Sequence, residues 1–130
     1  MPGAAALPRG EQTRTSILDA AESALEIQQR MAKRNSDLPA DKRLLFRIGI
    51  AIGDVILDGD DRHGEGVNLA ARLEAIAEPG GICVSEDVQH AVRNRPAFQF
   101  TSLGTPPLKN ITAPLELFEP VPVPSFLRAV

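Results

Sequence analysis

Residues 44–53 of the 130-residue chain read Leu-Leu-Phe-Arg-Ile-Gly-Ile-Ala-Ile-Gly. Large residues recur at every second position as far as Ile52, and Gly49 and Ala51 lie between them. Because successive side chains of a strand point to opposite faces, the pattern predicts a strand with one face of large residues and one of small residues. The small face would admit the close approach of a helix or of a ligand.

Helices are expected on either side of this strand in the sequence. Apolar residues at helical spacing predict a first helix that begins with Ser16 as its N-cap and ends near Asn35. After a second short strand at 55–57 and a turn at 58–61, the same spacing predicts a helix at 64–77. The Pro-Gly-Gly that follows should end it.

The rest of the chain predicts shorter elements. They are a strand at 82–84, a helix at 86–93 capped by Ser85, a strand at 98–100, a loop at 104–107 and a last strand at 115–118. Pro120, Pro122 and Pro124 should end regular structure. Residues 1–15 show no periodicity and are expected to be a flexible arm. This order of elements indicates an α/β or α+β sheet covered by helices.

Composition excludes several classes of protein. The net charge of −3 gives no overall field for nucleic acid or an anionic membrane. Cys83 is the single cysteine, so a disulfide within the chain is impossible and a reducing cytoplasm is the expected location. No apolar run is long enough for a membrane span.

Four polar residues stand out from these patterns. Asn68 and Arg72 are four positions apart on the predicted helix and therefore share a face, Asp61 precedes that helix, and Lys109 lies between two predicted strands. A guanidinium suits phosphoryl oxygens, an amide can hold a sugar oxygen, and an ammonium can meet a polyphosphate. Taken alone, an Asn and an Arg at this spacing are more often solvated neighbours on a helix.

The wider sequence resembles a known family. Residues 47–55 read Arg-Ile-Gly-Ile-Ala-Ile-Gly-Asp-Val, and residues 64–74 read Gly-Glu-Gly-Val-Asn-Leu-Ala-Ala-Arg-Leu-Glu. Together with Ala-Glu-Pro-Gly-Gly-Ile-Cys-Val-Ser at 77–85 and Leu-Lys-Asn-Ile at 108–111, they resemble the class III adenylate and guanylate cyclase catalytic domain. The resemblance implies an α+β, ferredoxin-like cyclase fold with a mixed or mostly antiparallel sheet, helices on one side, and the first strands missing.

The resemblance also implies a role for each of the four residues. Asn68 matches the family Asn that orients the ribose, and Arg72 matches the Arg that stabilises charge on the α-phosphate. Asp61 falls where the family recognises the purine and favours ATP over GTP, while Lys109 falls where a Lys contacts the terminal phosphates. The family converts ATP into cyclic AMP and pyrophosphate with two Mg²⁺ or Mn²⁺ ions.

Half of the family site has no counterpart in the sequence. The two Asp residues that bind the metals in the family precede the helix that is expected here from Ser16, and residues 1–15 contain one acid, Glu11. Asp54, Asp58 and Asp60 are better explained as turn and strand-end residues. The isolated chain is therefore expected to have no metal ligands and little or no activity.

Several interpretations remain open from the sequence. Residues 16–120 would form a partial cyclase domain, with an extended tail at 121–130. It could pair with itself or with a metal-bearing cyclase chain, because family sites form between two head-to-tail subunits. The alternatives are a non-catalytic dimerisation or regulatory module, and a fragment of a full-length adenylate cyclase.

Overall fold

The computed structural model describes residues 3–7, 13–53, 56–58, 61–63, 65–95, 98–109, 111 and 114–122. A five-stranded sheet has the order β1-β2-β5-β7-β6, with β1 (Gly3–Leu7), β2 (Ile48–Ile52), β5 (Ile82–Ser85), β7 (Leu117–Pro122) and β6 (Phe98–Gly104). A separate hairpin joins β3 (Ile56–Asp58) to β4 (Asp61–His63). The helices are α1 (Thr13–Asn35), α2 (Glu65–Ile76) and α3 (Glu86–Val92), with a 3₁₀ turn at Ala40–Lys42.

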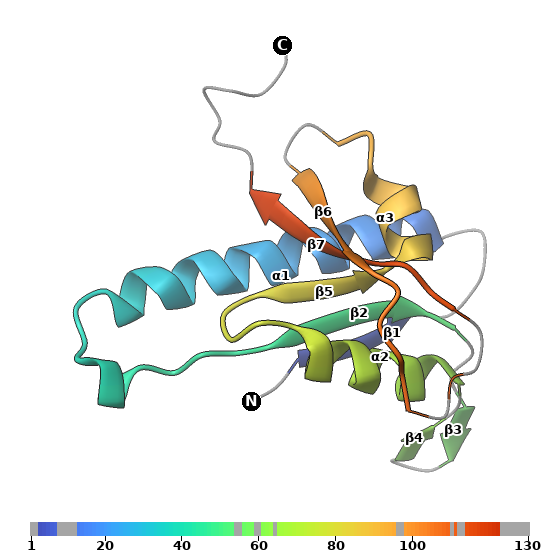
Figure 1. The fold of residues 1–130 in the computed structure, drawn as a ribbon, viewed down its shortest axis with the longest axis horizontal. Coiled ribbons are helices and arrows are strands. Elements are labelled where there is room, and N and C mark those ends of the chain that lie inside the picture. The colour runs from blue at the N-terminus through green and yellow to red at the C-terminus, as the bar shows by residue number, and fades with distance from the viewer. Residues whose placement is uncertain are drawn as a thin grey trace.

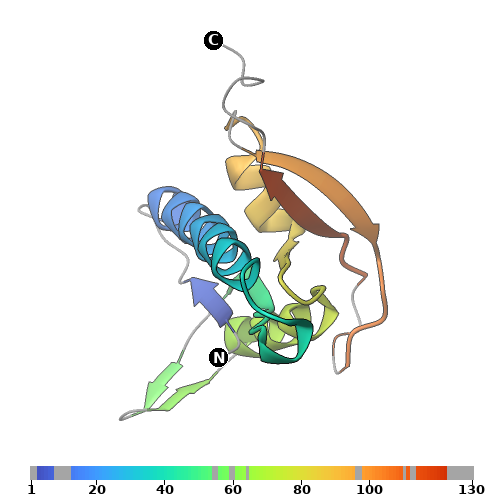
Figure 2. The same ribbon diagram turned by 90° about the vertical axis from the view of Figure 1, so that its left-hand side faces the viewer.

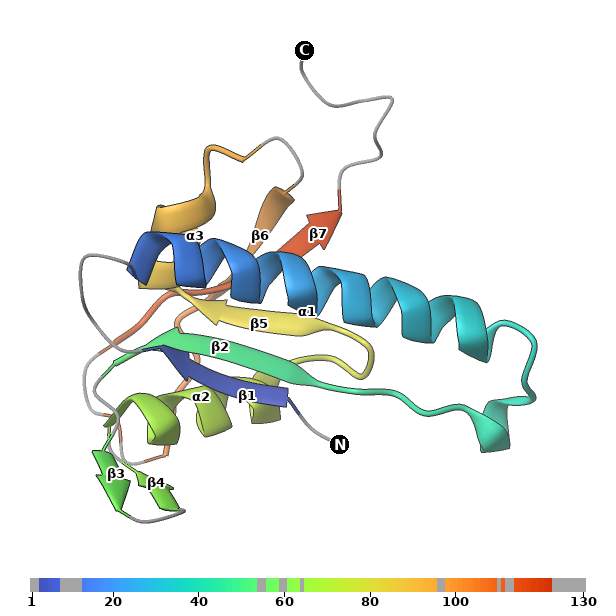
Figure 3. The same cartoon turned by 180° about the vertical axis from the view of Figure 1, so that it is seen from behind.

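The main sheet is mixed, as the sequence predicts. β1, β2 and β5 run parallel to one another, whereas β7 is antiparallel to both β5 and β6. Helices α1 and α3 cover one face and α2 covers the other (Figures 1 and 3). The expectation that all helices lie on one side is therefore wrong. The β6–β7 ribbon and the β3–β4 hairpin lie at opposite ends of the molecule (Figure 2).

The two faces of β2 explain this arrangement. Ile48 and Ile50 are buried in the core shared with α1 and α3, whereas Ala51 is buried in the core shared with α2. A Cβ placed on Gly49 would lie 2.4 Å from the Glu74 nitrogen and 2.6 Å from the Ala70 oxygen, both backbone atoms of α2. The close approach predicted for the small face is therefore made by a helix.

The amino-terminal prediction is wrong for residues 3–7. They form β1, which pairs in parallel with β2 from Gly3 opposite Ile48 to Leu7 opposite Ile52, and α1 already begins at Thr13 rather than after a cap at Ser16. The Gly-Ala-Ala-Ala-Leu sequence of β1 has low intrinsic strand propensity, so pairing with β2 determines its conformation. The strand contains no carboxylate.

The carboxyl-terminal prolines also lie within the sheet rather than ending it. Pro120 and Pro122 in β7 are opposite Phe100 and Phe98 of β6. The partner on the other side, β5, pairs with β7 only at Leu117 and Phe118. Beyond that point β7 has a neighbour on one side only, so a proline without an N–H is tolerated. The folded part therefore extends beyond 16–120 at both ends.

Two buried amides on α1 hold the backbone that leads into the sheet. The Asn35 amide donates to the Leu44 carbonyl at 2.6 Å and accepts from the Leu44 N–H at 3.2 Å. The Gln28 amide donates to the carbonyls of Phe46 at 3.1 Å and Gly81 at 2.7 Å. Asn35 thus supplies the partners of the Leu44 backbone. Gln28 instead adds a second donor to two carbonyls that already accept from the backbone N–H groups of Gly80 and Ile48.

Replacing Asn35 with Ala should lower the free energy of unfolding by about 2 kcal/mol, because both polar groups of Leu44 lose their partner in a partly buried place. Urea unfolding followed by far-UV circular dichroism measures the change. Ser36→Ala is the matched control: its hydroxyl bonds the Lys33 carbonyl at the exposed surface, and the expected change is within about 0.5 kcal/mol. Equal effects of the two substitutions would contradict this role of Asn35.

Candidate functional site

Helix α2 presents Asn68 and Arg72 on the side that faces away from the sheet. Its apolar side buries Ala70 and Leu73 against β2 and β5. Asn68 is exposed and Arg72 is half-buried, one turn further along the same face. The helix ends before Pro79, and Gly80 then adopts a φ of +81° that favours glycine.

Arg72 and Lys109 meet, through the main chain of Lys109. The Arg72 Nε–H donates to the Lys109 carbonyl at 3.2 Å, across 37 positions of sequence. The connection from β6 to β7 runs back beside α2 and brings Lys109 there (Figure 1). The Lys109 side chain is exposed. A guanidinium and an ammonium therefore belong to one small region of the surface.

The turn around Lys109 is itself closed by two apolar residues. Leu108 and Ile111 form an isolated antiparallel bridge, with the Ile111 N–H donating to the Leu108 carbonyl at 3.1 Å. Leu108 packs against the buried cluster on the α2 side of the sheet. Both residues were missed as site residues from the sequence, where the only signal is that they flank Lys-Asn.

Asp61 belongs to a different local structure from the one predicted. It is the first residue of β4, opposite Asp58 of β3, rather than part of a turn. Asp61 is close to Asn68 and Arg72 in the sequence, because β4 is followed directly by α2. Gly66 is buried within the first turn of α2, and Gly64 lies outside the described residues.

The described residues do not fit a divalent metal site. Within the described ranges, no three His, Cys, Asp or Glu side chains gather closely enough to hold an ion. Two of the acids considered from the sequence, Asp54 and Asp60, lie outside those ranges.

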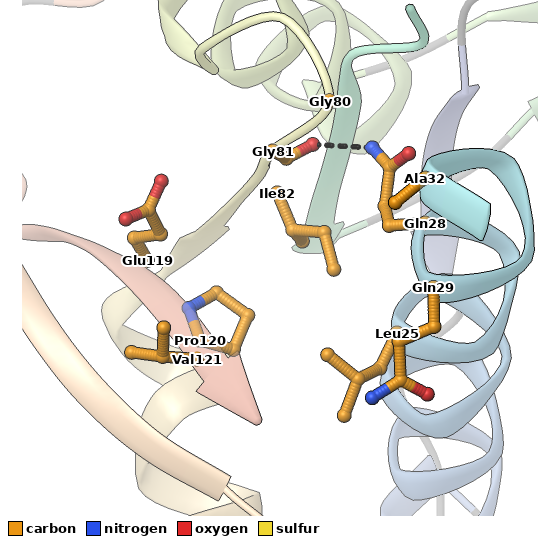
Figure 4. A pocket seen from close by; sticks show the side chains of 10 residues that line it. All are labelled: Leu25, Gln28, Gln29, Ala32, Gly80, Gly81, Ile82, Glu119, Pro120 and Val121. Carbon is orange, nitrogen blue, oxygen red and sulfur yellow. Dashed lines mark hydrogen bonds between the residues drawn. The ribbon is translucent and has the colours of Figure 1, made fainter. Parts of the chain in front are cut away.

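A cavity of about 280 Å³ lies elsewhere, between α1, β5 and β7 (Figure 4). It opens where pairing between β5 and β7 stops, and Leu25, Ile82 and Pro120 make much of its wall. None of the four predicted site residues lines it. A mostly apolar wall does not suit a triphosphate, so we do not place the nucleotide here.

Ser85 and Cys83 on β5 are both buried in the interior of the protein. Ser85 is the N-cap residue of α3, as predicted, but its hydroxyl makes no capping bond. Burial, and to a smaller extent the nearby Glu119 carboxylate, raises the pKa of the Cys83 thiol to about 12. Cys83 is thus a small core residue, and the sequence interpretation agrees.

Cys83 should resist thiol reagents at pH 8 while the protein is folded. With a pKa of about 12, roughly one thiol in ten thousand is ionised at that pH, and the sulfur is fully buried. Labelling with iodoacetamide, followed by mass spectrometry, should be fast only in denaturant. Glu119→Gln should leave it slow, because burial is the larger cause. Rapid labelling of the folded chain would disprove this description of Cys83.

The chain is similar to known proteins over most of its length. The family described as "Adenylate and Guanylate cyclase catalytic domain" matches residues 4–118. The chain is 39% identical over 103 residues to the "Putative adenylate cyclase 3" of Rhizobium meliloti, covering 79% of this chain and 18% of that protein. The chain thus spans under a fifth of the length of this curated relative.

Solved structures give the same result for the fold. The adenylate/guanylate cyclase/hydrolase from Silicibacter pomeroyi is 48% identical with a TM-score of 0.75, covering 82% of this chain and 63% of that one. The adenylyl cyclase CyaB from P. aeruginosa, 19% identical, shares the fold with a TM-score of 0.63 over 88% of this chain and 61% of that one. No helix in the described part combines the length and hydropathy needed to cross a bilayer. The chain belongs to the adenylate and guanylate cyclase catalytic domain family.

Proposed function

We propose that this chain supplies the Asn/Arg half of a class III nucleotide cyclase site, meaning Asn68 and Arg72 on α2. The observation that supports the proposal is the hydrogen bond from Arg72 to the Lys109 carbonyl, because it joins two residues that are 37 positions apart in the sequence and both carry a positive charge. The substrate would be ATP, and the products cyclic AMP and pyrophosphate.

Each residue has a physical task in this proposal. The terminal N–H groups of Arg72 would stabilise the charge that builds on the α-phosphate as the ribose 3′-hydroxyl attacks. Asn68, one turn away and exposed, would orient the ribose. Lys109 would bind the terminal phosphates as a point charge. Asp61 would favour adenine.

The proposal includes a metal-bearing partner chain. Two divalent ions activate the nucleophile in the family, and no group of this chain's described residues fits them. In this proposal the metal-binding Asp residues lie on a second, head-to-tail cyclase chain. A homodimer would duplicate the Asn/Arg half without completing the site.

The test of the proposal is complementation. The chain is mixed with a class III cyclase chain that carries both metal-binding Asp residues but has its own Asn and Arg replaced by Ala. Cyclic AMP formation from Mn²⁺ and ATP should appear in the mixture and should be absent from the mutated partner alone. A mixture that stays silent while the two chains co-elute would favour a purely structural or regulatory module instead.

The isolated chain should form no detectable cyclic AMP with Mn²⁺ and ATP. Without a metal to assist it, the 3′-hydroxyl is a weak nucleophile and the triphosphate charge is only partly compensated. The measurement is a cyclic AMP assay on purified protein, with a complete cyclase as the positive control. Clear metal-dependent turnover by the chain alone would refute the half-site description.

A further inference from the structure

We propose that Leu108 is a positioning residue for Arg72 and acts through the peptide carbonyl of Lys109. The inference rests on the proposed function for its catalytic consequence, but its structural part concerns the orientation of one guanidinium. Leu108 would touch neither the nucleotide nor any reacting atom.

The Lys109 carbonyl restricts the orientation of the Arg72 guanidinium. A guanidinium is planar and carries five N–H donors in a rigid fork. When the Nε–H donates to the Lys109 carbonyl at 3.2 Å, the plane is held and the two terminal NH₂ groups are left for another acceptor. A phosphate meeting Arg72 would thus find the paired terminal donors already aimed. Half-burial of Arg72 limits the orientations that compete.

Packing of Leu108 and one backbone hydrogen bond hold the turn that contains the Lys109 carbonyl. Leu108 packs against a buried cluster on the α2 side of the sheet, made of Ala51, Ala70, Leu73, Ala77, Cys83 and Leu117. The Ile111 N–H closes the turn onto the Leu108 carbonyl at 3.1 Å. Leu73 is the neighbour of Arg72 in α2, so one helix provides both the guanidinium and part of the surface that anchors its acceptor. Loosening Leu108 should therefore release Arg72.

The main-chain carbonyl and the side-chain ammonium of Lys109 have separate roles in this proposal. The carbonyl of Lys109 accepts the hydrogen bond from Arg72, whereas its side chain is exposed. Under the proposed function the side-chain ammonium would bind the terminal phosphates. Lys109→Met keeps the carbonyl and removes the ammonium. Leu108→Ala keeps the ammonium and loosens the carbonyl. The two variants should therefore have different signatures.

The structural part is tested by NMR on the isolated ¹⁵N-labelled chain, through hydrogen exchange of the Arg72 Nε–H. The signal is assigned by its loss in Arg72→Lys. Exchange should be slow in the wild type and in Lys109→Met, and faster by about tenfold in Leu108→Ala. Leu108→Met should restore slow exchange, because it refills the same space. If Leu108→Ala fails to fold, Leu108→Val serves in its place; equal exchange in wild type and the folded variant would overturn the inference.

The catalytic part is tested in the complemented pair. Leu108→Ala should lower kcat about tenfold with little change in KM, because a misaligned Arg72 loses charge stabilisation in the transition state. Lys109→Met should mainly raise KM. An unchanged kcat in Leu108→Ala would overturn the inference. If the wild-type mixture itself is inactive, the proposed function fails, and the exchange measurement still decides whether Leu108 positions Arg72.

Discussion

Replacing Arg72 with Ala should reduce cyclic AMP formation by the complemented pair by about 100-fold or more, the usual cost of losing one donor to a developing oxyanion. The Arg72 Nε–H donates to the Lys109 carbonyl, and under the proposed function the terminal donors of the guanidinium would meet the α-phosphate. Arg72→Lys should recover only a small part of the rate, because an ammonium keeps the charge and loses the planar fork. The measurement is kcat at saturating ATP and Mn²⁺.

The control for Arg72 is Arg34→Ala, which removes an exposed cation from the last turn of α1. It should leave the rate of the pair within about twofold, since an exposed charge that is not part of the proposed site contributes little. Co-elution of the two chains should be the same for both variants. An Arg72→Ala pair with the wild-type rate would show that the Asn/Arg half takes no part in the chemistry.

The largest effect on stability is expected for Gly49→Ala, at about 3 kcal/mol of lost unfolding free energy. The added Cβ would lie 2.4 Å and 2.6 Å from two backbone atoms of α2, so no side-chain rotation relieves the contact. Helix α2 would have to move away from β2, and it carries Asn68 and Arg72. The midpoint of urea unfolding measures the loss.

Gly104→Ala is the control for Gly49. Gly104 has a φ of +76°, but apart from its own chain neighbours no heavy atom of the described residues lies within 4 Å of an added Cβ. The expected cost is about 1 kcal/mol, from the strained backbone alone. If both substitutions cost the same, crowding between β2 and α2 is not what makes glycine necessary at position 49.

Predictions from the sequence succeeded for elements whose apolar residues recur at the regular spacing of a strand or a helix. The alternation in 44–53 predicted β2 and its small face, although the strand begins only at Ile48 and not at Leu44. Helical spacing predicted α2 within one residue at each end. The same spacing placed Asn68 and Arg72 together, and the structure agrees that they share a face of α2.

Predictions failed where distant parts of the chain decide the conformation. β1 is an alanine-rich strand that exists through its pairing with β2, and the prolines of β7 are tolerated because β5 stops short of them. In the site, the contact of Arg72 with Lys109 is made by a backbone carbonyl, which every residue has. No side-chain pattern could have indicated it.

The most direct test of the half-site is a titration. A fixed amount of the metal-bearing, Asn- and Arg-deficient cyclase chain receives increasing amounts of this chain, and cyclic AMP formation is measured with Mn²⁺ and ATP. We predict that neither chain is active alone, and that the rate rises and saturates near one chain per partner. Turnover by this chain alone, or a silent mixture of chains that bind each other, would contradict the assignment of Asn68 and Arg72 as half of a cyclase site.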